Sequence, residues 1–133
     1  MSRRETREAV FKLIYETELC GEINELSVEQ IKSEIDQSDD AYFESTFYGV
    51  QEHHKKLSDM IATYTGSFAY ERLYKVDLSI LLLAVYEIMF TDIPNKVSVN
   101  EAVELAKAYS TEKSASFING ILASIIKNSN KEA

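Results

Sequence analysis

The sequence predicts an all-α protein, a compact bundle of about seven helices, and three observations carry this prediction. The 133-residue chain contains one proline and four glycines, so few positions interrupt a helix. Its apolar residues recur at the helical spacing over most of the length. Hydrophobic residues make up 45% of the composition. A chain of this kind can bury one core without disulfides or a structural metal, so residues 1–133 are expected to form a single domain.

The amino-terminal half is predicted to form three helices, over residues 4–19, 27–35 and 41–64. Gly21 follows the first helix as a C-terminal cap, Ser27 opens the second, and Gly66 ends the third. Gly49 lies inside the third helix, where glycine costs about 1 kcal/mol relative to alanine. We therefore expect another helix to pass close to Gly49.

The carboxyl-terminal half is predicted to form a short turn at "YERLYK" and three further helices, over residues 77–90, 98–109 and 114–127. The helix over 77–90, "DLSILLLAVYEIMF", is apolar almost all round and is expected to be the central, most buried one. "SVNE" at residues 98–101 has the spacing of a capping box that would begin the next helix. The segment near residues 65–75 is expected to divide two subdomains.

Charge is distributed unevenly along the chain. The formal charge is −8, which argues against a protein that coats nucleic acid with its whole surface. Residues 1–12 differ, because they hold four basic and two acidic residues. The only cysteine, Cys20, excludes a disulfide within the chain and makes the reducing cytoplasm the expected compartment. The longest apolar run, residues 80–86, is far shorter than the roughly 20 residues of a membrane span.

Four side chains fall together on one shoulder of the first predicted helix: Arg4, Arg7, Phe11 and Tyr15. Arginine neutralises phosphate, and aromatic rings stack on unpaired bases for about 1–3 kcal/mol per base. With Arg3 beside them, these residues are predicted to bind single-stranded RNA. Spacing alone favours a second interpretation, in which Phe11 and Tyr15 pack at the edge of the core and Arg4 pairs with Glu8.

Residues 74–122 carry a series of motifs: "VDLSILLLAVYE", "IPNKV", "NEAVELAK" and "SFING". In this order they resemble the NusB family of bacterial transcription antitermination factors. "RRETREAVFKLIY" at residues 3–15 is similar to the opening of the same family, so the resemblance covers essentially the whole chain. It implies an all-helical fold of two packed three-helix subdomains. It also implies binding to the boxA element of nascent ribosomal RNA, jointly with the ribosomal protein NusE, in a complex that joins RNA polymerase and suppresses premature termination.

The resemblance assigns roles to individual residues. It implies RNA contacts for Arg4 and Arg7, stacking for Tyr15, an acidic contact with RNA and NusE for Asp77, and an RNA-facing ring for Phe117. Asp77 also fits an ordinary N-cap, and Phe117 also fits the core. Glu71 is a weaker acidic candidate for partner binding. Lys113 stands where the family often has an acid, and Ser116 where it has a lysine, so Lys113 is expected to meet phosphate.

Other function classes find little support in the sequence. Catalysis needs a positioned nucleophile, base or metal set, and no cofactor is expected. His53 and His54 point in different directions on a helix, so no metal site is predicted. Some ribosomal-RNA methyltransferases carry a NusB-like domain, but no glycine-rich cofactor loop is found here. The alternative that stays open is a helical module that binds a basic ribosomal protein without touching RNA. A monomer or weak homodimer is expected.

Overall fold

The computed structural model describes residues 2–130, except for the side chains of Phe68 and Asn130, and the described residues form helices and connections without any strand. The elements are α1 (Arg3–Cys20), α2 (Glu25–Glu34), the 3-10 helix η1 (Gln37–Asp39), α3 (Asp40–Glu52), α4 (His54–Thr65), α5 (Ser67–Glu71), α6 (Lys75–Phe90), α7 (Asn95–Tyr109) and α8 (Glu112–Asn130). The all-α prediction is confirmed.

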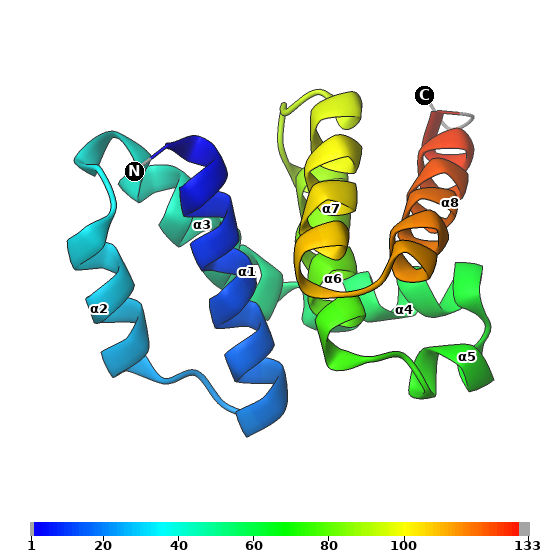
Figure 1. Ribbon diagram of the computed structural model, residues 1–133, viewed down its shortest axis with the longest axis horizontal. Coiled ribbons are helices and arrows are strands. Elements are labelled where there is room, and N and C mark those ends of the chain that lie inside the picture. Colours follow the sequence, from blue (N-terminus) through cyan, green and yellow to red (C-terminus); the bar gives the residue numbers. More distant parts are fainter. Residues whose placement is uncertain (1, 131–133) are drawn as a thin grey trace.

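Helix α6 is the centre of the bundle. It packs against α1, α3, α4, α7 and α8, and every residue from Asp77 to Glu87 is buried. Figure 1 shows α1, α2 and α3 together at one side, α7 in front of α6, and α8 beside α7 with α4 and α5 below. The prediction that the almost wholly apolar helix is the central one is confirmed, because such a helix is stable only where neighbours cover all of its faces.

The predicted helix over residues 41–64 is broken in two, which corrects the sequence interpretation. α3 ends at Glu52 and α4 begins at His54, with the backbone of His53 at φ −99° and ψ 15°. The ring of His53 stacks on Phe90 of α6, with 4.3 Å between the ring centroids. The break redirects α4, and its apolar residues Leu57 and Ile61 are fully buried.

Gly49 has the close neighbour that its position predicted. A Cβ atom at Gly49 would overlap the ring of Tyr86 on α6. The glycine therefore allows α3 to approach α6 more closely than any larger residue would.

The predicted capping box at residues 98–101 does not form. α7 already begins at Asn95, so Ser98 lies inside the helix, where it is 2% exposed. Its hydroxyl donates to Glu87 Oε1 at 2.7 Å. A capping box does form at α1, where the Ser2 hydroxyl accepts from the backbone N–H of Glu5 and the Glu5 carboxylate accepts from the backbone N–H of Ser2.

None of the helices among residues 2–130 combines the length and apolarity that crossing a bilayer requires. The predicted division of the chain into two subdomains near residues 65–75 stays a prediction about folding units.

Candidate nucleic-acid interface

Arg7 is buried, in contrast to the accessible position that the sequence suggested. It is 6% exposed. Its Nε donates to Glu87 Oε2 at 2.8 Å, and its Nη1 donates to Glu101 Oε1 at 3.3 Å. Burial lowers the pKa of Arg7 and hydrogen bonding to Glu87 raises it, with a net upward shift, so the guanidinium stays charged. Arg7 thus fastens α1 to α6 and α7 and presents no free surface to phosphate.

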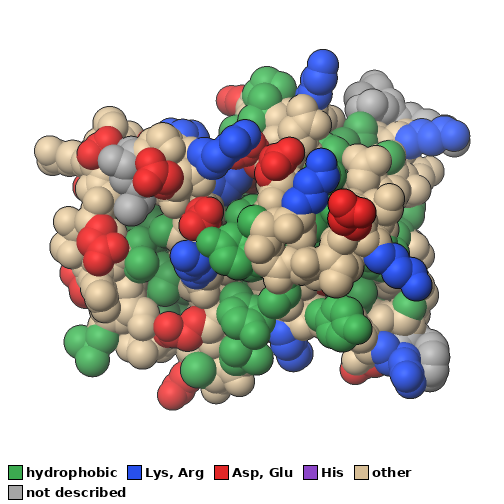
Figure 2. All heavy atoms as spheres, in the orientation of Figure 1, with side chains coloured by type: hydrophobic (Ala, Val, Ile, Leu, Met, Phe, Trp, Pro, Cys, Tyr) green, Lys and Arg blue, Asp and Glu red, His purple; other side chains and the backbone are tan. Residues whose placement is uncertain are grey.

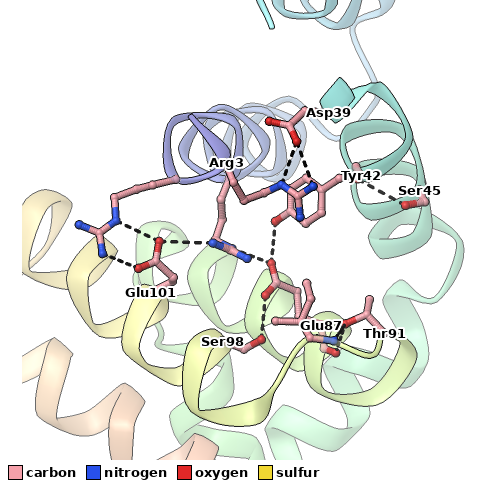
Figure 3. Close-up of polar contacts among 11 residues, drawn as sticks. Arg3, Asp39, Tyr42, Ser45, Glu87, Thr91, Ser98 and Glu101 are labelled. Carbon is pink, nitrogen blue, oxygen red and sulfur yellow. Dashed lines mark hydrogen bonds and ion pairs between the residues drawn. The ribbon is translucent and has the colours of Figure 1, made fainter. Parts of the chain in front are cut away.

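Glu87 collects three donors at the middle of the bundle. Besides Arg7, the Tyr42 hydroxyl donates to Oε2 at 2.6 Å, and the Ser98 hydroxyl donates to Oε1 at 2.7 Å. Figure 3 shows this network between α1, α3, α6 and α7. Burial, followed by the nearby Glu87 carboxylate, raises the pKa of Tyr42 well above its usual range, so Tyr42 remains a donor. A buried carboxylate is stable here because each oxygen is satisfied.

Arg4 is also paired but stays accessible. Its Nε and Nη2 donate to Oε1 and Oε2 of Glu101 at 3.1 and 2.7 Å, while 69% of its side chain remains exposed (Figure 3). The pKa of Arg4 is raised by this hydrogen bonding, and the pKa of Glu101 is lowered by the same contact. The alternative pairing of Arg4 with Glu8 is wrong, because Glu8 pairs with Lys12 at 3.4 Å.

Arg3 makes the third ion pair of this end of α1. Its Nε and Nη2 lie 3.0 and 2.9 Å from Asp39 Oδ1, and its guanidinium lies 4.3 Å from the centroid of the Tyr42 ring. Thr6 donates to the other oxygen of Asp39. All three amino-terminal arginines are therefore neutralised within the fold, and Arg4 is the one whose side chain is mostly exposed.

The aromatic residues of α1 do not form an exposed shoulder. Phe11 is 2% exposed and packs on Tyr109 with 5.3 Å between the ring centroids. Tyr15 is half-buried. Phe11 packs in the core, as the second interpretation of the spacing expected, and the RNA contact predicted for its ring has no exposed surface here.

Asp77 is buried as well, at 4% exposure. Its two oxygens accept from the hydroxyls of Ser110 and Ser114, each at 2.8 Å. α6 begins at Lys75, so Asp77 is neither its N-cap nor an accessible acid. It ties α6 to the end of α7 through Ser110 and to the first turn of α8 through Ser114, and the predicted contacts of this carboxylate with RNA and NusE have no exposed surface here.

Further accessible side chains lie on the neighbouring helices. Phe117 on α8 is 37% exposed and Lys113 is exposed at the start of α8. Glu71 is exposed at the end of α5. Tyr109, at the end of α7, is 39% exposed, and Lys12 Nζ lies 5.5 Å from the centroid of its ring. The sequence interpretation did not identify Tyr109 as an accessible ring, because Tyr109 continues the apolar spacing of α7.

A polar groove of about 580 Å³ runs between α7 and α8, and Arg4 lies at its margin. Its polar lining also holds Asn100, Glu104 and Lys107 from α7, and Glu112, Ser116 and Asn119 from α8. Two cations here can meet phosphate, and the amides and hydroxyl can hydrogen-bond to base edges. These residues come from separate helices, so no local sequence pattern joined them. Figure 2 shows basic side chains over this face, with acidic ones among them.

The positions of the metal-ligating residue types and of the two histidines in the fold decide whether they could form a site. Within residues 2–130, no three His, Cys, Asp or Glu side chains are grouped in a way that could hold a metal ion. His54 contacts Glu18 and Ser58, and His53 stacks on Phe90, so the two histidines face different neighbours.

Known proteins are similar to this chain in sequence. The model of the NusB family matches residues 4–127. The chain belongs to the NusB family. A transcription antitermination protein NusB from Listeria monocytogenes serotype 4a is 43% identical over 127 residues, covering 94% of this chain and 96% of the relative.

Solved NusB structures share the fold. The NusB structure from T. maritima superposes with a TM-score of 0.87 at 36% identity, covering 96% of this chain and 92% of the other. A crystal structure of antitermination factors NusB and NusE in complex with dsRNA has a TM-score of 0.85 at 24% identity, covering 95% and 96%. The second match is evidence for the fold alone.

Proposed function

We propose that this chain is a transcription antitermination protein that binds the boxA element of nascent ribosomal RNA together with NusE. In this role it helps RNA polymerase to read through terminators. The observation that carries the proposal is membership in the NusB family over residues 4–127, with a transcription antitermination protein as a 43% identical relative. A member of the same fold occurs in a complex with NusE and RNA.

The surface that best fits RNA runs from the margin of α1 across α7 and α8. Arg4 and Lys107 supply cations at the polar groove. Lys113 adds a cation at the start of α8, while Tyr109 and Phe117 offer partly exposed rings for unpaired bases. Cations and exposed rings together are typical of single-stranded RNA binding.

The other amino-terminal ion pairs serve this surface indirectly. Arg7 and Arg3 hold α1 against α6, α7 and η1 through Glu87, Glu101 and Asp39. That attachment fixes the position of Arg4 beside the groove. The proposed assignment is therefore phosphate contact for Arg4 and positioning for Arg7.

The remaining parts of the proposal concern partners and setting. The formal charge of −8 favours a basic partner such as a ribosomal protein, and the exposed Glu71 is the candidate contact for it. The proposed setting is the cytoplasm, with the chain as a monomer or weak homodimer, acting by binding rather than by catalysis and without a cofactor.

One observation favours the alternative of a pure protein-interaction module. Each of the three amino-terminal arginines is already paired with a carboxylate. RNA binding therefore requires phosphate to compete with those carboxylates or to use other cations of the surface.

A titration of labelled boxA RNA with and without NusE separates the two functions. Arg4→Ala combined with Lys107→Ala is expected to weaken RNA binding roughly tenfold at physiological salt, because two phosphate contacts are lost. The slope of log affinity against log salt should fall by about 1.4 for a single strand. Fluorescence anisotropy over a salt series measures both quantities.

The matched control is Lys55→Ala combined with Lys56→Ala, which removes the same charge from exposed positions on α4. NusE association, followed by calorimetry, should be nearly unchanged in the groove variant. Equal RNA affinity and slope in both double variants would favour the interaction module.

A further inference from the structure

Glu101 lies between two arginines that differ in accessibility. Its Oε1 accepts from Arg4 Nε and Arg7 Nη1 at 3.1 and 3.3 Å, and its Oε2 accepts from Arg4 Nη2 at 2.7 Å. The side chain of Glu101 is 13% exposed and that of Arg7 is 7% exposed, against 69% for Arg4. Arg4 is therefore the one member of this trio that can move into solvent without opening the core.

Departure of Arg4 leaves one net negative charge, because Arg7 then serves as the shared cation of both Glu87 and Glu101. Glu101 retains its contact with Arg7, and Arg7 retains its 2.8 Å contact with Glu87. Each carboxylate thus keeps Arg7 as a cationic neighbour without Arg4, and the excess negative charge falls on Glu101, which is 13% exposed against 1% for Glu87. This matters because a carboxylate left in the core without any cation would block such a movement.

Arg4 also lies where two hollows of the surface meet. It lines a cavity of about 180 Å³ with Arg7, Glu101 and Leu105, and it lines the larger groove that holds Lys107 and Asn119. A change in the direction of one flexible, mostly exposed side chain would move its guanidinium from the carboxylate toward the groove.

We propose that Glu101 restrains RNA binding by occupying Arg4 in the free protein, and that an RNA phosphate group takes Arg4 from Glu101 on binding. Glu101 is a positioning residue in this scheme, since it acts through Arg4. The inference rests on the proposed RNA-binding function and adds a regulatory carboxylate to it. A phosphate must compete with Glu101, so weak or wrongly placed RNA is rejected before Arg4 is released.

The expected effect of removing this restraint is modest. Exposed ion pairs are weak, and losing the competitor for Arg4 should tighten RNA binding by about two- to five-fold. Glu101→Gln is the suitable variant, because the amide oxygen of glutamine can still accept from Arg7 while the negative charge is lost.

Glu104 provides a matched control on the same helix. It lies one turn further along α7 and lines both hollows with Arg4. Glu104→Gln removes the same charge, whereas the guanidinium contacts of Arg4 go to Glu101. RNA affinity is measured for wild type, Glu101→Gln and Glu104→Gln, each also in the Arg4→Ala background, with boxA RNA and NusE present.

The scheme expects Glu101→Gln to bind RNA two- to five-fold more tightly than Glu104→Gln when Arg4 is present, and equally when Arg4 is alanine. Thermal unfolding establishes that each variant is folded. If Glu101→Gln and Glu104→Gln bind RNA equally while Arg4 is intact, the inference is overturned. The proposed RNA-binding function still stands in that case, provided that the wild type binds RNA. Absence of RNA binding by the wild type, with NusE present, would overturn the proposed function and this inference with it.

Nuclear magnetic resonance of the arginine Nε groups gives an independent readout. RNA should shift the Arg4 Nε signal in the wild type and leave the Arg7 Nε signal in place. An unmoved Arg4 signal at saturating RNA would contradict the exchange of partners.

Discussion

Arg7 and Arg4 stand one helical turn apart on α1, yet the fold treats them differently. The side chain of Arg7 is 7% exposed and reaches Glu87 in the middle of the bundle, whereas that of Arg4 is 69% exposed and reaches Glu101. Of these two identical side chains, Arg7 holds helices together in the core and Arg4 remains an accessible cation. The difference follows from their partners, since Arg7 reaches Glu87 of α6 and Glu101 of α7, whereas Arg4 reaches Glu101.

The largest expected effect concerns stability. Arg7→Ala leaves the carboxylate of Glu87, which is 1% exposed, without its cation. Breaking such a buried pair costs about 3–5 kcal/mol of unfolding free energy. Urea denaturation of Arg7→Ala measures this cost. Arg4→Ala is the matched control and should cost less than about 1 kcal/mol, because its pair is exposed. Similar losses in both variants would break the contrast between the two arginines.

The second effect concerns RNA affinity at the aromatic positions. Phe117→Ala should weaken boxA RNA binding by about 1–3 kcal/mol, the contribution of one stacked base, because its ring is partly exposed and lies one helical turn from Lys113 on α8. Anisotropy titration with NusE present provides the value.

Phe11→Ala serves as the buried counterpart of that variant. Its ring is 2% exposed, so its removal should act on unfolding free energy, by about 3–5 kcal/mol. Loss of RNA affinity in a folded Phe11→Ala protein, together with unchanged affinity in Phe117→Ala, would reverse the assignment of the two rings.

The smallest effect is the pH dependence of the stability that Glu101 contributes. Hydrogen bonding to Arg4 lowers the pKa of Glu101 from its ordinary value of 4.5. A lowered pKa in the folded state means that the unfolded chain binds more protons as the pH falls below 4.5. The stability contributed by Glu101 is therefore complete above that pH and is lost as the pH falls through the lower, folded-state pKa.

The difference in unfolding free energy between wild type and Glu101→Gln, measured by urea denaturation, should be constant from neutral pH to about 5 and shrink below 4.5. A difference that instead changes between pH 6 and 8 would point to another titrating group.

Much of the fold could be predicted from local patterns. The apolar character of residues 77–90 identified the central helix, and Gly49 indicated the close approach that Tyr86 makes. The break at His53 could not be predicted, since neither proline nor glycine marks it and it depends on stacking with Phe90. Helical periodicity does not report where a neighbouring helix forces a change of direction.

The candidate site was less accessible to such reasoning, because its contacts span most of the chain. The partners of Arg7 lie 80 and 94 positions further along the sequence. One signal was present: Glu87 is an acid inside an otherwise apolar helix, and such a residue requires a buried donor. Starting from Glu87 leads to Arg7 as its cation, whereas starting from the helical wheel of α1 leads to a surface that Phe11 and Arg7 do not form.

The distance in sequence between Arg7 and its carboxylates also bears on how the chain matures. During synthesis, the amino-terminal arginines leave the ribosome long before Glu87 and Glu101 do. Until α7 has emerged, Arg4 and Arg7 therefore lack the carboxylate of Glu101 that both contact in the folded protein. The attachment of the first helix is thus completed only after the seventh has been made.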